Sequence, residues 1–146
     1  MDVKFVFSRG MDQVPNYATP DAAAVDLRAA VDSEVTLNPG EKALIPTGIS
    51  IEPQAKDVVA IVAGRSGLGI KHGVTLSNGI GVIDADYRGE ICVGLINHGS
   101  RPFSIERGDR IAQLFFLPVI HANFIKSLSL SETDRGAGGF GSTGTK

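Results

Sequence analysis

The chain has one cysteine, no tryptophan, few aromatic residues and no long hydrophobic run. Because Cys92 is alone and no cysteine–histidine cluster accompanies it, an intramolecular disulfide and a structural zinc site are excluded. No stretch reaches the roughly 18 apolar residues that a membrane span needs, and the N-terminus lacks the pattern of a signal peptide. We therefore expect a cytoplasmic protein with no membrane partner.

A surplus of positive charge is also missing. The chain carries 14 Lys and Arg against 16 Asp and Glu, which gives a formal net charge of −2. The electrostatic pattern of a nucleic-acid-binding protein is therefore absent, and we predict no nucleic acid partner. A small polyanionic ligand stays open, because a few convergent arginines can hold one without changing the net charge.

Turn-forming residues are abundant. Eighteen glycines and seven prolines in 146 residues leave little room for a long helix, and the length suits one domain. Short runs rich in β-branched or aromatic residues predict strands over residues 3–7, 34–37, 58–63, 90–97, 103–105 and 110–119. The pattern predicts an all-β sandwich, barrel or jelly roll. Residues 66–71 could form one short helical turn at most, since Gly67 and Gly69 weaken it.

The composition changes near residue 131. We expect a folded domain over residues 1–130 and a glycine-rich C-terminal segment over 131–146, which has too little apolar surface to hold itself in place. A solvated tail without function is one interpretation. Arg135 and Phe140 favour another, because a cation and a ring on a flexible strap suit an arm that closes over a ligand.

A glycine-rich stretch, residues 64–69, follows the apolar run 58–63. It places the Arg65 guanidinium, the Ser66 hydroxyl and glycine N–H groups at the end of a strand. Phosphate oxygens prefer this combination, since arginine binds them bidentately and glycine lets backbone donors approach closely. An ordinary strand-to-turn junction is an equally good interpretation of the spacing alone.

Residues 78–90 carry more chemistry than any other stretch. A glycine-bearing hairpin there could offer backbone groups and the Asn78 amide to a flat base, and Asp84 could act as a general base on water. Taken alone, Asp84 is more simply part of a solvated turn. Tyr87 is ambiguous in the same way, because a lone tyrosine is usually a half-buried core residue.

Together these segments resemble the five sequence motifs of the trimeric dUTPase family, in order and over nearly the whole chain. The motifs correspond here to residues 23–29, 64–69, 78–90, 108–114 and 135–144. One such motif would be weak, whereas five in order are hard to obtain by chance. The resemblance implies a dUTPase-like β jelly roll of the β-clip type that forms a homotrimer and exchanges its C-terminal arm.

The resemblance also implies an activity, the hydrolysis of dUTP to dUMP and pyrophosphate, which keeps uracil out of DNA and supplies dUMP for dTMP synthesis. Asp84 would activate the attacking water. Mg²⁺ would bridge the phosphates, with Asp26 in its outer shell through water. The implied substrate-binding residues are Arg65, Ser66, Gly67 and Gln113 for the phosphates, Asn78, Gly79, Val82 and Ile83 for uracil, Tyr87 for deoxyribose, Arg135 for the γ-phosphate and Phe140 over the base.

Four positions depart from the family pattern. Cys92 stands where other members carry various residues, often a lysine, and a backbone contact to the nucleotide there would survive the change. Ala24 stands where glycine is usual, so the local turn must adjust if the position needs positive φ. Gly64 replaces the usual proline and Gly69 the usual alanine, which should loosen the phosphate loop without removing its donors. None of these departures deletes a predicted catalytic side chain.

Two alternatives remain. A dCTP deaminase shares the fold but needs a glutamate base and a serine-rich arginine loop, whereas this chain has Asp84 and Arg65-Ser66-Gly67. A dUTPase-like trimer could instead recognise a regulatory protein partner, with hydrolysis secondary. The third and fifth motifs favour retained catalysis and leave an added partner open.

Overall fold

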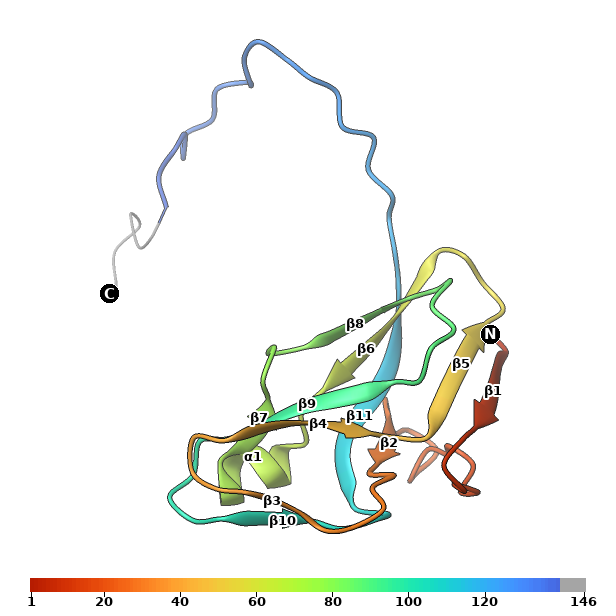
Figure 1. Cartoon of the computed structure of the whole chain (residues 1–146). Helices are drawn as coiled ribbons and strands as arrows, with labels where there is room; N and C mark the ends of the chain where they lie inside the picture. Colours follow the sequence, from red (N-terminus) through yellow and green to blue (C-terminus); the bar gives the residue numbers. More distant parts are fainter. Residues whose placement is uncertain (140–146) are drawn as a thin grey trace.

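Strands dominate the computed structural model, which describes residues 1–139 (Figure 1). The strands are β1 (Val3–Phe7), β2 (Val25–Arg28), β3 (Val35–Leu37), β4 (Lys42–Pro46), β5 (Ile49–Pro53), β6 (Val58–Ala63), β7 (Val74–Leu76), β8 (Gly81–Asp84), β9 (Cys92–Asn97), β10 (Phe103–Ile105) and β11 (Arg110–Pro118). One helix, α1 (Ser66–His72), lies between β6 and β7. The predicted all-β jelly roll is confirmed.

The strands pair antiparallel throughout the described chain. A four-stranded sheet has the order β2-β11-β6-β8 and a three-stranded sheet the order β4-β9-β7, while β1 pairs with β5 and β3 with β10. Buried side chains from both larger sheets, among them Leu27, Ile45, Leu95 and Ile111, meet in one core. In β6 the consecutive residues 60–62 are all buried, because this strand has neighbours on both edges and is covered on both faces.

Helix α1 is longer than the single turn that the sequence predicts. It spans seven residues, about two turns, in spite of Gly67 and Gly69. The C-terminal end of the helix is fixed by Gly73. Gly73 adopts φ 72° and donates its N–H to the Gly69 carbonyl, and a Cβ at Gly73 would lie 2.5 Å from the Gly99 nitrogen. Only glycine satisfies both the left-handed conformation and this close approach.

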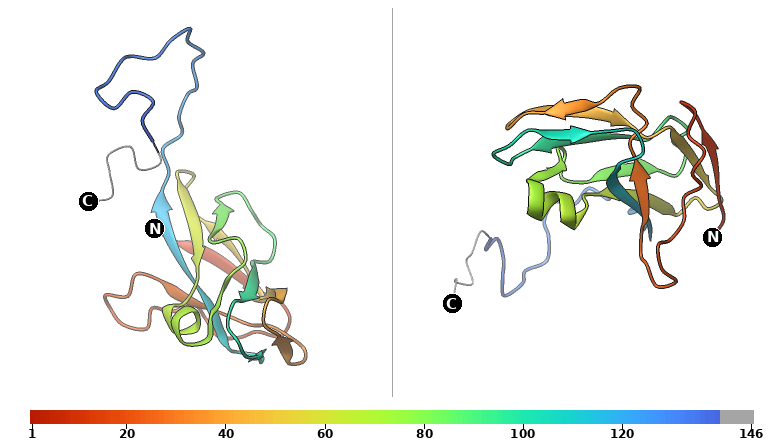
Figure 2. Two further views of the ribbon diagram at one scale, coloured as in Figure 1. Left: turned by 90° about the vertical axis from the view of Figure 1, so that its left-hand side faces the viewer. Right: turned by 90° about the horizontal axis from the view of Figure 1, so that it is seen from below.

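Beyond β11 the chain leaves the body. Val119 donates its N–H to the Asp57 carbonyl, and residues 120–139 then extend beyond the sheets (Figure 1 and the left view of Figure 2). Large apolar side chains on this segment are almost fully exposed: Ile120, Phe124, Ile125, Leu128 and Leu130. The predicted division of the chain at residue 130 stays a prediction. Within the described residues no helix is long and apolar enough to span a membrane.

Asn97 joins the end of β3 to the loop between β9 and β10. It is fully buried, and its amide nitrogen donates to the Leu37 and Arg101 carbonyls at 2.8 Å each, while its side-chain oxygen accepts from the Gly99 N–H at 2.8 Å. Its removal would leave these three backbone groups without their partner.

We expect Asn97→Ala to lower the free energy of unfolding by about 2–4 kcal/mol, because buried unsatisfied groups keep their full desolvation cost. Urea unfolding followed by circular dichroism at fixed protein concentration measures the change. Asn38→Ala is the matched control, since Asn38 is exposed, and should cost about 0.5 kcal/mol or less. Equal losses in the two variants would contradict the assignment.

Candidate active site

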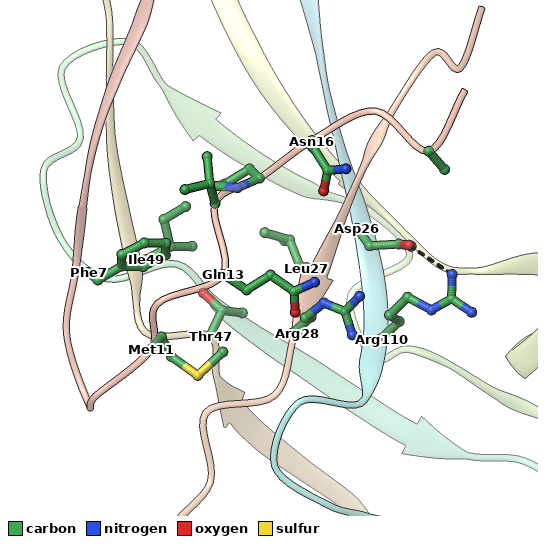
Figure 3. Close-up of a pocket in the computed structure, with 13 residues that line it drawn as sticks. Phe7, Met11, Gln13, Asn16, Asp26, Leu27, Arg28, Thr47, Ile49 and Arg110 are labelled. Carbon is green, nitrogen blue, oxygen red and sulfur yellow. Dashed lines mark hydrogen bonds and ion pairs between the residues drawn. The ribbon is translucent and has the colours of Figure 1, made fainter. Parts of the chain in front are cut away.

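Three charged side chains form a compact cluster on the solvent side of the four-stranded sheet. Asp26 of β2 accepts from Arg65 Nε at 2.9 Å through Oδ1 and from Arg110 NH1 at 3.3 Å through Oδ2. Arg65 also donates to the Arg110 carbonyl at 3.1 Å. The Asp26–Arg110 pair is visible in Figure 3. Two guanidinium groups share one carboxylate, so the cluster carries a net positive charge and suits an anion.

A β-bulge gives the cluster its geometry. Along β2 the burial alternates, with Val25 and Leu27 inside and Asp26 on the opposite face. Arg110 and Gln113 are three residues apart on β11, so in a regular strand they would face opposite sides. The pairing with β2 shifts register between Arg110 and Ala112, which absorbs one residue and turns both polar side chains toward Asp26.

The chain enters α1 directly from this cluster. Arg65 is the N-cap residue in extended conformation, and Ser66 and Gly67 form the first turn of the helix. The first N–H groups of a helix lack intrahelical partners and no side chain caps them here, so they are available to an anion. Gln113 donates its amide to the Gly64 carbonyl at 2.9 Å and holds the loop against β11.

A separate pocket opens beside the Asp26–Arg110 pair under the loop that precedes β2 (Figure 3). Its walls come from loop residues 11–18 and from the side chains of Phe7, Leu27 and Ile49. Asp26 is the only predicted site residue among those that line this pocket within the described chain. The predicted residues therefore do not converge on it.

A second group of predicted residues surrounds a small cavity of about 140 Å³ between β8 and β9. Asn78, Val82 and Ile83 line it, together with Cys92 and Gly94. The predicted hairpin is wrong, because β7 pairs with β9 whereas β8 pairs with β6. Residues 77–80 thus cross from one sheet to the other, and Gly79 adopts φ 76° in that turn.

Cys92 was not singled out as a site residue, yet its thiol is exposed at this cavity. Partial burial and then the negative charge of Glu90 raise the pKa of Cys92, so the thiol is the favoured form near neutral pH. Gly94 lies beside it, and an added Cβ there would come within 2.6 Å of the Ser77 hydroxyl oxygen, so Ser77 would have to rotate. The cavity wall is uncharged and tightly defined.

Asp84 ends β8 at the edge of the four-stranded sheet and is exposed. Its carbonyl accepts from the Tyr87 N–H at 3.1 Å. This hydrogen bond closes a turn that brings the two residues close together. The Tyr87 hydroxyl donates to the Glu90 carbonyl at 3.0 Å, and the ring stays 43% exposed. A carboxylate and an aromatic face therefore stand next to each other at the sheet edge.

These two clusters are far apart in one chain. Asp26 pairs with Gln113, which pairs with Ala63, whereas Asp84 pairs with Val59 at the other end of β6. Three strand spacings and four residues of rise give a separation on the order of 20 Å. Within one chain, the arginine cluster around Asp26 and the Asp84–Tyr87 pair therefore do not meet.

The remaining predicted residues lie on the C-terminal segment. Arg135 is exposed and donates through Nε to the Gly138 carbonyl at 3.0 Å, within its own turn. Phe140 lies outside the described residues. The predicted contacts of both residues with a ligand stay predictions.

Arg110 is the main residue that the predicted set omitted. The sequence indicated it only as a charged residue at the start of a long apolar strand. It gives no indication of the bulge that turns Arg110 toward Asp26. The structure answers the question raised for Ala24, and the loosening of the phosphate loop by Gly64 and Gly69 stays a prediction. Ala24 needs no positive φ, since Arg9 is the residue other than glycine with positive φ among those described, and side chains at Gly64 and Gly69 would meet ordinary contacts.

Comparison with known proteins identifies one family. The dUTPase family matches residues 12–144. A deoxyuridine 5'-triphosphate nucleotidohydrolase of Desulfitobacterium hafniense is 56% identical over 132 residues, which cover 90% of this chain and 87% of the relative. The protein of the same name from Serratia proteamaculans is 49% identical and covers 99% of this chain and 96% of its own.

Solved structures agree on the fold. A mutant dUTPase of Staphylococcus bacteriophage 80alpha with dUpNHpp superimposes with a TM-score of 0.87 at 23% identity, over 98% of both chains. A mutant dUTPase from phage phi11 of S. aureus, described for its coordination of a structural Mg(II) ion, has a TM-score of 0.80 at 20% identity and covers 90% of this chain and 100% of its own.

Proposed function

The chain belongs to the dUTPase family, and we propose that it hydrolyses dUTP to dUMP and pyrophosphate with Asp84 as the general base. One observation carries the proposal. Two groups of side chains have the chemistry of the two ends of this substrate: Arg65 and Arg110 on one carboxylate for a triphosphate, and an uncharged cavity lined by Asn78, Val82 and Ile83 for a nucleoside, with Asp84 next in the sequence.

The phosphate end is assigned to Arg65, Ser66, Gly67 and Gln113. Asp26 fixes the Arg65 guanidinium from one side, which leaves its other N–H groups to phosphate oxygens. Arg110 joins this set because it shares the same carboxylate. Arg135 would add a further cation at the γ-phosphate when the arm closes.

The nucleoside end is assigned to the cavity between β8 and β9. Backbone groups near Asn78, Gly79, Val82 and Ile83 read uracil, and the small volume of the cavity, about 140 Å³, disfavours a base with an added methyl group. Tyr87 offers a ring face to the deoxyribose because its hydroxyl is already engaged by Glu90. Phe140 would stack over the base.

In the chemical step, the Asp84 carboxylate accepts a proton from water while the water oxygen forms a bond to the α-phosphorus. The bond from that phosphorus to the bridging oxygen breaks, and the electron pair leaves with pyrophosphate. The arginines stabilise the negative charge that develops on the leaving group. The exposed position of Asp84 at the end of β8 gives water direct access.

Magnesium fits this donor set. Residues 1–139 hold no group of three or more His, Cys, Asp and Glu that could form a protein cage, and Mg²⁺ commonly binds through substrate phosphates, water and one or two carboxylates. Asp26 would take part through water. The bound ion supplies charge neutralisation on the triphosphate.

We also propose a homotrimer. The separation between the two clusters means that a complete site needs a second copy of the chain, and closed rings place the same two surfaces against each other at every interface. The exposed apolar side chains of the segment 120–130 support an arm that packs on a neighbour. The proposed cytoplasmic location rests on the sequence features described above, namely the single cysteine and the lack of a long apolar run.

The activity is tested by pyrophosphate release from dUTP, dTTP, dCTP and UTP, with Mg²⁺ and with EDTA. We expect turnover of dUTP that the chelator abolishes, and Asp84→Asn should lose about 10²–10⁴-fold in kcat while still binding dUTP. The non-hydrolysable analogue dUpNHpp serves as the binding probe. Near-normal turnover in the variant would reject Asp84 as the base, and turnover of no nucleotide would favour a silent trimer that binds another protein.

The shared site is tested by complementation. Arg65→Ala and Asp84→Asn, each inactive alone, are co-expressed with different affinity tags and purified through both tags. Every mixed trimer then has one interface that joins an intact Arg65 to an intact Asp84, so about one third of wild-type activity should return. A site confined to one chain would give no recovery, because every chain carries a defect.

Asp26 is tested by Asp26→Asn, which keeps the shape and removes the charge. If Asp26 mainly orients the arginines, KM for dUTP should rise about 10-fold while the Mg²⁺ concentration for half-maximal rate stays unchanged. A selective rise in the Mg²⁺ requirement would instead support the outer-shell role. Normal kinetics in both respects would refute both roles.

A further inference from the structure

Tyr87 is held by its own loop. Its hydroxyl donates to the Glu90 carbonyl, and the end of its side chain lies against Gly89, where an added Cβ would come within 2.6 Å of the Tyr87 Cζ atom. A side chain at position 89 would therefore displace the Tyr87 ring. The position of the ring therefore depends on where the backbone of residues 89 and 90 is fixed.

Glu90 fixes that backbone through its side chain. Oε1 accepts from the Gly48 N–H at 2.7 Å, and both carboxylate oxygens accept from Arg9 Nε at 2.9 and 3.0 Å. The carboxylate is only 21% exposed. The next residue is bound as well, because the Ile91 N–H donates to the Ile49 carbonyl at 2.9 Å. The sugar-binding loop is thus tied to the turn between β4 and β5.

Arg9 is an unusual anchor. It adopts φ 52°, the one positive φ at a residue other than glycine among those described, which is sterically unfavourable for a side chain. Arg107 donates to its main-chain oxygen and holds it in that conformation. The hydrogen bond to Glu90 raises the pKa of Arg9, so the guanidinium stays charged. Arg107 holds the main chain of Arg9 and Glu90 holds its side chain. These contacts, at an unfavourable φ, indicate that the position of the Arg9 guanidinium matters.

We propose that the Arg9–Glu90 ion pair is a specificity device: it positions Tyr87, and through Tyr87 it sets how strongly the site prefers 2'-deoxyribose to ribose. Arg9 and Glu90 are positioning residues, since neither needs to touch the nucleotide. This inference rests on the proposed hydrolysis of dUTP and on the assignment of Tyr87 to the sugar.

The physical reason is steric. The Tyr87 hydroxyl is engaged by Glu90, so the ring discriminates by shape, and a ring that can shift by a fraction of an ångström admits a 2'-hydroxyl. A steric pocket of this kind discriminates by about 10²-fold at best, which makes it sensitive to small displacements. The phosphate cluster lies elsewhere, so turnover of dUTP should change little.

The test compares kcat/KM for dUTP and UTP in wild type, Arg9→Gln and Glu90→Gln. We expect the preference for dUTP to fall about 5- to 10-fold in both variants, with kcat for dUTP within about twofold of wild type. Arg9→Lys should recover part of the preference because it restores the charge. Lys4→Gln is the matched control, since it breaks the exposed Lys4–Glu52 pair of 3.9 Å and should leave the ratio unchanged.

A second measurement needs no variant. The ion pair is partly exposed, so raising NaCl from 0.05 to 0.5 M should lower the dUTP preference of the wild type and leave that of Arg9→Gln unchanged. Both nucleotides carry the same triphosphate, so screening of the phosphate cluster cancels in the ratio. An unchanged ratio in Arg9→Gln and Glu90→Gln, or a salt-independent ratio in the wild type, overturns the inference. Absence of dUTP turnover in the wild type would instead remove the proposed function.

Discussion

Strand β11 is the constraint on which the rest of the structure depends. It pairs with β2 on one edge and β6 on the other, buries Ile111, Ala112 and Leu114, and continues into the C-terminal segment. Its bulge decides which face Arg110 and Gln113 occupy. A single pairing register therefore sets the core, the arginine cluster and the point at which the arm departs.

The sequence predicted the parts of the fold whose signals are local. Strands β1, β6 and β10 were predicted with their observed ends, because each is a continuous apolar or β-branched run between turn residues. Five strands were missed. β2 alternates with charged Asp26 and Arg28, β4 and β5 end in proline, and the short β7 and β8 flank the turn at residues 77–80, so none stands out from its surroundings. Only tertiary pairing makes these segments strands.

In the candidate site, too, some features could be predicted from the sequence and others could not. Residue types that belong to a motif, such as Arg65 and Asp84, could be predicted from the resemblance. Contacts between distant residues could not, since Asp26 meets Arg110 across 84 positions and Glu90 meets Arg9 across 81. Both contacts depend on strand register and on a loop with positive φ at Arg9, and neither feature has a local sequence signal.

The two half sites are built within the chain before any assembly occurs. The Asp26–Arg65–Arg110 cluster is preorganised by ion pairs, and the base cavity is closely bounded at Gly81, where an added Cβ would lie 2.9 Å from the Val62 Cβ. Assembly would therefore not need to rearrange the arginine cluster or the base cavity. It would only need to bring the cluster of one chain and the cavity of another together around a nucleotide. In the proposed assembly the activity would depend on the interface and on the arm, so the exposed apolar segment 120–130 would contribute to catalysis through its contacts with a neighbouring copy.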